Sequence, residues 1–527
     1  MTVITENSIK PLPARSLRSR RVVIIGGGPA GLTASYELMR RGVKSVVIEK
    51  GEKVGGISRT EIYKGYRFDI GGHRFFTKVG EVQAIWKEIL GDDFIQVPRI
   101  SRIYYDGKFY DYPLSLGKTL QNLGPRQSVL ILFSYLKAKL KAFVRKGLYP
   151  DYELETFEEW VTDCFGERLY RMFFKSYTEK VWGIPCCEIR ADWAAQRIKN
   201  MSLKRAVINA VFGSQNAKSL IKQFDYPRLG PGMMWEACEQ RLIEGKHPVY
   251  LNSEVVSIEH KDQRIIRITV RHKEPGHNEI GHNETEHKAT HQEHRISTLT
   301  GTDFINSMPI STLVQSLNPR VPEDVLAAAR GLKYRDFLIV SLIINRASLF
   351  PDNWLYIHSP RFMVGRIQNF KNWSPAMVPE PRKTCLGMEY FCNEGEPLWK
   401  MSDADLITFA SREIVELKLG VQFSDIEDGC IIRQRKAYPV YDGEYRQHVQ
   451  VIKDYLDTFE NLQTVGRNGM HHYNNQDHSM LTALLAARNI VGEHHNVWDV
   501  NVERSYHENF TNAEWSTLTR PTATVNR

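Results

Sequence analysis

The chain has 527 residues, of which 42% are hydrophobic and 25% are charged. This composition is typical of a globular protein, and a chain of this length is too long for one hydrophobic core. No run of about 18 apolar residues occurs, which excludes a membrane-spanning helix. The formal net charge is +9, spread along the chain without a nucleic-acid-binding motif. We therefore expect a small-molecule substrate of anionic type as the partner, and no nucleic acid.

The cysteines and the N-terminus indicate a reducing compartment. The seven cysteines are scattered without a C-x-x-C pair, which favours free thiols over a disulfide framework. Residues 1–19 are polar and lack the apolar core of a secretory signal, so we interpret them as a flexible tail, with a second tail at 501–527. The sequence therefore predicts a cytoplasmic protein.

The segment from Arg21 to Lys50 predicts a dinucleotide-binding unit. A β-branched strand over 22–25 precedes a G-x-G-x-x-G pattern, a helix over 32–41, a second strand over 43–48 and an acidic residue. Glycines let a pyrophosphate approach the backbone, and the helix N-terminus offers free N–H groups. An acid after the second strand accepts hydrogen bonds from ribose hydroxyls. The residues concerned are Gly26, Gly28, Gly31 and Glu49.

Two further glycine clusters indicate that the cofactor is a flavin and not a nicotinamide. Gly55-Gly56 precedes Arg59-Thr60, and Gly71-Gly72 precedes His73. Together the three clusters resemble the flavin-containing amine oxidase superfamily. The resemblance implies FAD, bound noncovalently because the C-terminal cysteine motif of some amine oxidases is absent. It assigns FAD contacts to Gly26, Gly28, Gly31, Glu49, Gly56, Arg59, Thr60, Gly72, Val255, Gly466 and Arg467.

The next part of the chain has a helical pattern. Residues 104–112 predict a hairpin turning at Asp106-Gly107, and residues 114 to about 228 have few strand signals. Ser128 to Arg145 is apolar at first, then amphipathic and basic. Such a segment either lies on an anionic membrane surface or, more often, packs on its own domain with its lysines outward. Peripheral membrane contact stays open as an alternative.

Strand signals dominate the second half of the chain. A glycine-containing turn at 226–233 precedes a helix over 234–244, a hairpin covers 249–260 and 264–271, and the clearest later strands are 334–344 and 384–392. The polar stretch between residues 273 and 295 suits no known metal-ligand spacing, so we interpret it as a solvated loop and expect no metal. Its histidines are His277, His282, His287, His291 and His294.

These signals predict the fold class, which is α/β, an α+β two-domain flavoprotein. A Rossmann-like FAD-binding domain is expected at 20–110, 226–320 and 436–500. An interrupted helical and β-sheet substrate domain is expected at 111–225 and 321–435.

Two local stretches resemble UDP-galactopyranose mutases, and the first also resembles bacterial protoporphyrinogen-oxidase-like proteins. The first, 177–183, has the pattern Tyr-Thr-x-Lys-x-Trp-Gly, and in the second Gly466-Arg467 is followed six residues later by Tyr473. The resemblance places His73 and Tyr473 at the flavin as catalytic residues. It assigns substrate contacts to Tyr177, Lys180, Trp182 and Arg197. This chain is longer than the mutases, and their phosphate-binding arginines match Arg190, Arg197 and Arg205 by region only.

The last helix has a predicted role at the cofactor. Residues 480–490 have helical apolar spacing, and Asn475, Asp477 and Ser479 are candidate N-caps. In this superfamily the N-terminus of such a helix faces the pyrimidine end of the flavin. There it would stabilise negative charge that develops on reduction.

Two functions follow from the resemblance. The first is an FAD-dependent oxidoreductase that transfers a hydride to flavin N5 from a substrate that the sequence does not identify. The second is a redox-neutral sugar-nucleotide mutase that uses reduced FAD as a nucleophile, with a nucleotide sugar as its anionic substrate. The superfamily pattern favours the first, and the two local motifs favour the second.

Overall fold

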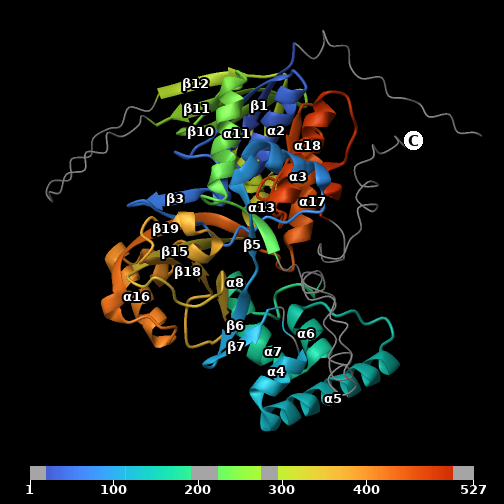
Figure 1. The fold of residues 1–527 in the computed structure, drawn as a ribbon. Helices are drawn as coiled ribbons and strands as arrows, with labels where there is room; N and C mark the ends of the chain where they lie inside the picture. Colours follow the sequence, from blue (N-terminus) through green and yellow to red (C-terminus); the bar gives the residue numbers. More distant parts are fainter. Residues whose placement is uncertain (1–18, 113, 115, 192–222, 274–294, 502–527) are drawn as a thin grey trace, which may run out of the picture.

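The computed structural model describes residues 19–112, 114, 116–191, 223–273 and 295–501. Figure 1 shows an α/β body that contains β1 and α18, a second body built around β15 and β18, and a helical layer that contains α5 and α6. Within the described residues, no helix combines the length and apolar character needed to cross a membrane.

A five-stranded parallel sheet forms the centre of the first body. Its order is β20 (Leu462–Thr464), β13 (Asp303–Asn306), β1 (Arg21–Ile25), β2 (Lys44–Ile48) and β9 (Val249–Tyr250). Val22 and Ile24 of β1 face one core, whereas Val23 and Ile25 face another. Burial on both faces explains why this strand is continuously apolar.

Helices cover one face of the parallel sheet, and a mixed layer covers the other. The Val22 side packs on α2 (Pro29–Arg40), α3 (Gly80–Leu90), α11 (Gly232–Glu244) and α18 (Gln476–Ile490). The Val23 side packs on α12 (Ile310–Ser316), α13 (Glu323–Gly331), α17 (Tyr445–Leu456) and a four-stranded sheet. That sheet has the order β12 (Arg295–Thr300), β11 (Arg264–His272), β10 (Ser253–Lys261) and β14 (Leu317–Asn318).

The second body is a seven-stranded sheet. Its order is β19 (Ile426–Pro439), β15 (Tyr334–Ile344), β18 (Thr384–Phe391), β17 (Arg366–Asn369), β16 (Trp354–Ile357), β6 (Ser101–Tyr105) and β7 (Lys108–Asp111). Helix α16 (Asp403–Glu416) packs on one face, where Leu406 and Ile414 join Leu338 and Met388 in one core. The short helices α14 (Phe370–Trp373) and α15 (Pro397–Lys400) lie in its connections.

The helical layer follows β7 in the chain. It comprises α4 (Leu116–Leu123), α5 (Pro125–Leu148), α6 (Phe157–Phe165), α7 (Glu167–Tyr170), a π-helical turn (Arg171–Lys175) and α8 (Ser176–Trp182). Two antiparallel pairs lie between the bodies: the hairpin of β3 (Thr60–Tyr63) with β4 (Tyr66–Asp69), and β5 (Phe94–Pro98) with the distant β8 (Gln223–Pro227). Thr156 caps α6, accepting a hydrogen bond from the Glu159 N–H at 3.2 Å.

Most predicted elements are confirmed with small shifts at their ends, and two expectations are wrong. Residues 223–227 form β8 and not a helix, because buried Phe224 and Tyr226 alternate with more exposed residues. The strand predicted over 249–260 is divided into β9 and β10, which belong to different sheets. Asn252 lies between them with a φ of 51°, which turns the chain from one sheet into the other.

The predicted domain boundaries and the sheets divide the chain differently at two places. Strand β6 lies before residue 110, where we expected the FAD-binding domain, but it pairs with β16 in the seven-stranded sheet. Strand β19 runs through residue 436, the other predicted boundary. The boundaries themselves remain a prediction.

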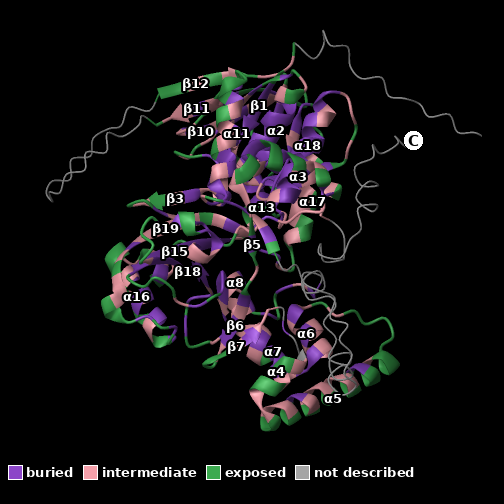
Figure 2. Cartoon of the chain, in the orientation of Figure 1, coloured by how far each residue is buried: buried purple, intermediate pink, exposed green. Residues whose placement is uncertain are grey.

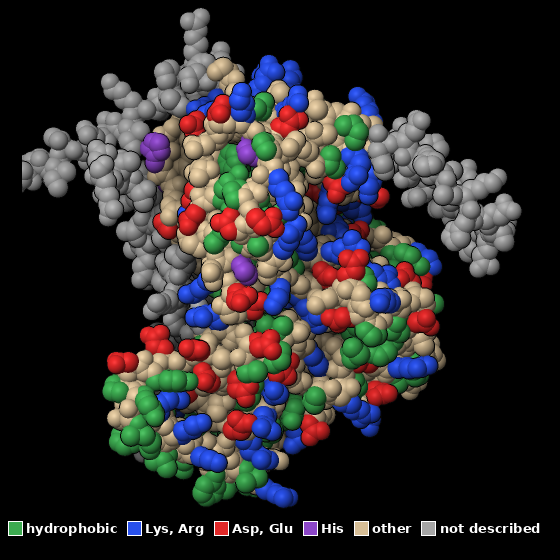
Figure 3. All heavy atoms as spheres, turned by 180° about the vertical axis from the view of Figure 1, so that it is seen from behind, with side chains coloured by type: hydrophobic (Ala, Val, Ile, Leu, Met, Phe, Trp, Pro, Cys, Tyr) green, Lys and Arg blue, Asp and Glu red, His purple; other side chains and the backbone are tan. Residues whose placement is uncertain are grey.

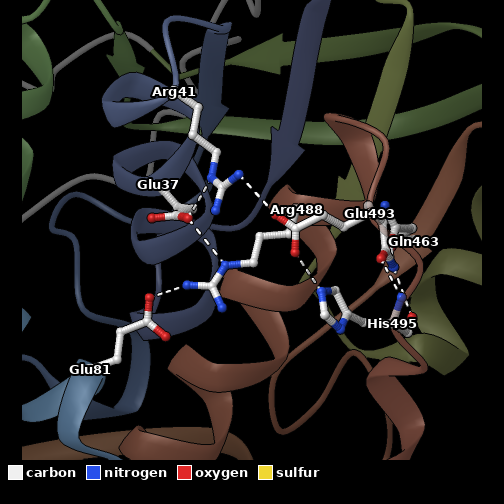
Figure 4. A network of polar contacts seen from close by, with 8 residues as sticks. Glu37, Arg41, Glu81, Gln463, Arg488, Glu493 and His495 are labelled. Atoms are coloured by element: carbon white, nitrogen blue, oxygen red, sulfur yellow. Dashed lines mark hydrogen bonds and ion pairs between the residues drawn. The ribbon is translucent and has the colours of Figure 1, made fainter. Parts of the chain in front are cut away.

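A network of ion pairs joins α2, α3 and α18 (Figure 4). Arg488 of α18 lies 3.3 Å from Glu37 of α2 and also pairs with Glu81 of α3. Arg41 contacts Glu37 at 2.7 Å and Glu493 at 3.0 Å. The Glu37 side chain is only 5% exposed, so its charge depends on these two arginines.

We expect Arg488→Met to lower the free energy of unfolding by about 1–3 kcal/mol, because buried Glu37 would lose one of its two cationic partners and keep only Arg41. Urea denaturation measures the change. Arg330→Met is the control, since its pair with Glu323 is exposed and should contribute less than about 1 kcal/mol. Equal losses in the two variants would contradict this role for Arg488.

Candidate functional site

A cavity of about 980 Å³ lies where the parallel sheet meets the seven-stranded sheet. Gly26 follows β1, Glu49 follows β2, Ser307 follows β13 and Gly466 follows β20, and all four line the cavity. They therefore mark the carboxyl ends of four neighbouring parallel strands. Ligands of open α/β sheets bind at this edge.

Two glycine turns meet in the cavity wall. Gly28 is the N-cap of α2, and a Cβ atom on Gly56 would lie 3.4 Å from the Gly28 Cα. The turns therefore lie against each other, and both present backbone without a side chain to the cavity. Gly31 serves packing, because its Cβ would lie 1.8 Å from the Gly26 carbonyl oxygen.

Glu49 is held in place by the backbone. One carboxylate oxygen accepts the Gly27 N–H at 2.6 Å, and the other accepts the Gly51 N–H at 2.7 Å. A carboxylate oxygen has further lone pairs, so both remain able to accept hydroxyl groups from a ribose. The arrangement fits the predicted role of Glu49.

Thr60 stands behind the wall and does not line the cavity. Its hydroxyl accepts the Gly232 N–H at 3.0 Å and donates to Asp69 at 2.9 Å. Asp69 also accepts a hydrogen bond from the Tyr226 hydroxyl and is 1% exposed. Burial raises the pKa of the Asp69 carboxyl to about 7.

This raised pKa predicts how stability depends on pH. Unfolding shifts the Asp69 pKa from about 7 back to 3.8. Between these pH values the folded state binds more protons than the unfolded state. The stabilisation by protonated Asp69 is therefore complete below the lower value and is lost as the pH rises through the higher one. Asp69→Asn should remove this pH-dependent loss of stability. Denaturation midpoints of the two proteins should then differ more at high pH than at low pH, and parallel profiles would contradict the assignment.

Arg467 lies between two tyrosine rings and keeps one nitrogen unpaired. Its guanidinium carbon is 4.1 Å from the Tyr473 ring centre and 4.8 Å from that of Tyr438. Its Nε donates to the Ala437 carbonyl at 3.1 Å and its Nη1 to the Asn474 carbonyl at 3.3 Å. Buried Nη2 has no hydrogen-bond partner among the described residues. A cation with an unused donor suits an anionic ligand.

The N-terminus of α18 borders the same cavity. Asn475 is its N-cap, and residues 474–479 line the wall. The Asn475 N–H donates to Nδ1 of His478 at 3.2 Å. One of the three predicted caps therefore precedes the helix, and the partial positive charge of the helix terminus lies at the cavity.

Arg366 and a group of tyrosines form the opposite wall. Nη2 of Arg366 donates to the Tyr438 hydroxyl at 2.9 Å, and its Nε pairs with Glu389. Gln368 donates to the same carboxylate at 2.8 Å. The rings of Tyr112 and Tyr356 lie 4.3 Å apart between their centres and also line the cavity.

His73 lines the cavity as a neutral ring. Its Nε2 donates to the Ile70 carbonyl at 2.9 Å, and burial lowers the pKa of the imidazole to about 4. At neutral pH the proton therefore stays on Nε2, and Nδ1 carries a lone pair. The ring can accept a hydrogen bond at that atom, whereas its lowered pKa makes it a weak proton acceptor.

The cavity wall is cationic overall. Nine Lys and Arg residues line it, against five Asp and Glu residues, and two of the nine, Arg366 and Arg435, pair with Glu389 and Glu394, which do not line it. The wall therefore favours anionic ligands. Within the described residues no group of three or more metal-ligating side chains occurs. The histidine-rich stretch lies almost wholly outside the described residues.

Comparisons with known proteins identify the fold. An NAD(P)-binding Rossmann-like domain matches residues 24–89. A probable UDP-galactopyranose mutase of Klebsiella pneumoniae is 24% identical over 185 residues, which cover 33% of this chain and 44% of that protein. The solved structure of a reduced UDP-galactopyranose mutase aligns with 90% of this chain over 94% of the mutase chain, with a TM-score of 0.74 and 20% identity.

This chain has the fold of a UDP-galactopyranose mutase. A putative protoporphyrinogen oxidase from Exiguobacterium is similar at a TM-score of 0.62 and 15% identity, over 90% of this chain and 98% of its own. The predicted α/β two-domain fold, with a Rossmann-like domain, is confirmed. The predicted resemblance to both groups is also confirmed at the level of fold.

The mutase fold brings most predicted residues to one cavity. The predicted residues that line it are Gly26, Gly28, Glu49, Gly56, Arg59, Gly72, His73, Val255, Gly466, Arg467 and Tyr473. Gly31 and Thr60 support it from behind. Arg197 lies outside the described residues.

Three predicted substrate residues do not line the cavity. Nζ of Lys180 donates to the Ser359 carbonyl at 2.7 Å and to the Ile357 carbonyl at 3.2 Å. The Tyr177 ring stacks on His358 with 4.6 Å between centres. Trp182 is buried, 6.0 Å from the Tyr473 ring, so it supports the wall from outside.

The fold also adds residues that the sequence reasoning missed. Tyr112, Tyr356, Arg366 and Tyr438 come from β-strands or their ends, where nothing local separates a ligand-facing residue from a core residue. Glu389 lies in the strand predicted over 384–392, where nothing local marks it as the partner of a cation. A buried Arg–Glu pair is visible only once β17 and β18 are known to be neighbours.

Proposed function

We propose that the chain is an FAD-dependent enzyme that acts on a nucleoside diphosphate sugar and isomerises it without net oxidation. The observation that carries the proposal is that cations and tyrosines line two sides of the cavity: Arg467 keeps an unpaired Nη2, and Arg366 lies with Tyr112 and Tyr356 on the other wall. The excess positive charge is about two once the pairs of Arg366 with Glu389 and of Arg435 with Glu394 are counted, and the FAD diphosphate would neutralise it at about one charge per phosphate. Hydrogen bonds from the second wall would hold the diphosphate of another ligand.

The residues present fit FAD. The turns at Gly28 and Gly56 present bare backbone to the cavity, where a diphosphate can approach, Glu49 offers acceptors to a ribose, and Arg467 has an unpaired Nη2. The N-terminus of α18 supplies a further positive end. When bound, FAD supplies either a hydride acceptor or, in its reduced form, a nucleophile.

The tyrosines and arginines of the second wall would hold the substrate. Tyr112 and Tyr356 offer aromatic faces for a sugar or a base, and Arg366 is fixed by Glu389. Arg467 sits between both walls and orients Tyr438 and Tyr473 through its contacts with their rings. These groups bind and position an anion without taking part in electron transfer.

The oxidoreductase, which the superfamily pattern favours, is the second candidate. One specific observation supports it: His73 lines the cavity as a neutral ring whose Nδ1 can accept a hydrogen bond from a substrate hydroxyl or amine. Such a contact would orient the substrate bond that is oxidised. We rank it second because the cationic wall suits a diphosphate better than an uncharged or cationic substrate.

An anaerobic experiment separates the two reactions. The flavin is reduced without oxygen, UDP-galactopyranose and other nucleoside diphosphate hexoses are added, and electron acceptors are supplied to a parallel sample. We expect isomerised sugar over many turnovers while the flavin spectrum stays reduced. Product that forms only with an acceptor, in step with reoxidation, would establish the oxidoreductase instead.

Tyr473→Phe should lower turnover by about 10- to 100-fold, the effect of losing one hydrogen bond to a charged group. FAD absorbance should stay unchanged, because the Tyr473 ring still packs against Arg467. Tyr445→Phe is the control, since Tyr445 stacks on Tyr441 without lining the cavity. Loss of FAD from the Tyr473 variant would move this residue to the cofactor side.

A further inference from the structure

The outer face of α5 carries the largest group of exposed apolar side chains among the described residues. Phe133, Leu140 and Phe143 are 68%, 66% and 77% exposed. Of the large hydrophobic residues that are exposed, ten of eighteen fall between Val129 and Tyr152. Figure 2 shows this exposure along the helix, and Figure 3 shows hydrophobic and basic side chains gathered at that end of the molecule.

The apolar residues form one continuous stripe. Val129, Phe133, Leu136, Leu140 and Phe143 follow one another at intervals of four and three residues, so they lie on one side of the helix. Monomeric proteins rarely expose apolar patches of this extent unless a surface binds there.

The opposite side of α5 is packed and fixed. Ile131 and Ala142 are buried, and Arg145 pairs with Asp163 of α6 at 2.6 Å. Lys139 donates to the Asp163 carbonyl at 2.6 Å. The exposed stripe is therefore held outward by contacts on the inner side.

Charge complementarity indicates what covers the stripe. Helix α5 contains six Lys and Arg residues and no Asp or Glu. Lys137, Lys141 and Lys146 form no ion pair with a described residue. Lys137 and Lys141 also line an apolar groove beside the stripe, with Leu140 and Tyr149. Apolar side chains flanked by cations fit an anionic lipid surface.

Like charges disfavour two other occupants. A second copy of α5 would bring its own six cations against the first set. Residues 192–222 carry six Lys and Arg and one Asp, so this segment would also meet α5 with like charge.

We propose that α5 lies on an anionic membrane surface, with the Val129-to-Phe143 stripe at the acyl boundary and Lys137, Lys141 and Lys146 against lipid phosphates. The helix lies in the plane of the interface and does not cross the bilayer. The proposal is independent of the reaction that the cavity catalyses.

Vesicle flotation of the full chain tests the proposal, with vesicles of phosphatidylcholine alone or mixed with phosphatidylserine. We expect binding to the mixed vesicles that weakens as salt rises. Replacing Lys137, Lys141 and Lys146 by Gln should weaken it by roughly 100-fold. Phe133→Gln with Phe143→Gln should weaken it about tenfold or more. Met363→Gln with Phe423→Gln is the control, since these residues are exposed elsewhere.

Flavin absorbance and circular dichroism should be the same in all variants, which shows that they fold. Equal binding to both vesicle types, or binding to neither, would overturn the proposal. A dimer in light scattering that the phenylalanine variant dissociates, without vesicle binding, would assign the stripe to a second copy of the chain instead.

Discussion

Gly28→Ala should weaken FAD binding by about 10- to 100-fold, which corresponds to the roughly 1–3 kcal/mol of an overpacked methyl group. The nearest protein atom to the new Cβ would be the Gly56 Cα at 3.9 Å, an ordinary contact distance. The protein itself therefore accepts the methyl group, and the loss comes from the diphosphate that must approach this turn. Flavin content after gel filtration, with reconstitution by added FAD, measures the effect.

Two other glycines make this test specific. Gly31→Ala places its Cβ 1.8 Å from the Gly26 carbonyl oxygen, so it should impair folding as well as FAD binding. Gly80→Ala meets no atom within 4 Å and should change neither property. Full flavin occupancy in the Gly28 variant, with normal stability, would show that the diphosphate binds elsewhere.

The second large effect is expected at the buried pair of Arg366 and Glu389. Arg366→Met leaves the Glu389 carboxylate, which is fully buried, without its cation. We expect the free energy of unfolding to fall by about 3–5 kcal/mol. Combining Arg366→Met with Glu389→Gln removes both charges and should restore much of this loss, which a double-mutant cycle measures.

Turnover separates the structural role of this pair from a role in the reaction. The double variant should regain stability but not activity, because the cavity still lacks the Arg366 cation. Strictly additive losses of stability would show that the two charges do not depend on each other. Recovered activity would remove Arg366 from the substrate wall.

The local parts of this fold could be predicted from the sequence, and the long-range parts could not. The strand, glycine turn and helix around Gly28 are encoded within one continuous segment, so their roles follow from spacing. The pairing of β1 with β13 joins residues about 280 positions apart in the sequence, and no local pattern predicts this pairing. Arg366 and Tyr112 escaped prediction for the same reason.

Motif resemblance located a region of the chain but not the direction of each side chain. Lys180 belongs to the Tyr-Thr-x-Lys-x-Trp-Gly pattern, yet its ammonium group is occupied by backbone carbonyls, and burial lowers its pKa to about 8. Tyr473 and Arg467 belong to a comparable pattern and do reach the cavity. The difference arises from packing around α8, where His358 and Trp182 fill the intervening space.

The order of strands in the parallel sheet also constrains biosynthesis. Strands β1 and β2 are synthesised before β9 and β13, and β20 is synthesised after all four. Until then the nascent chain has β13 as an open sheet edge, which is prone to pair with other chains. Gly466 and Arg467 follow β20 closely, so the cavity wall is complete only after more than 400 residues that follow the Gly28 turn have been synthesised. We therefore expect FAD to bind after β20 has joined the sheet, and not to the isolated N-terminal βαβ unit.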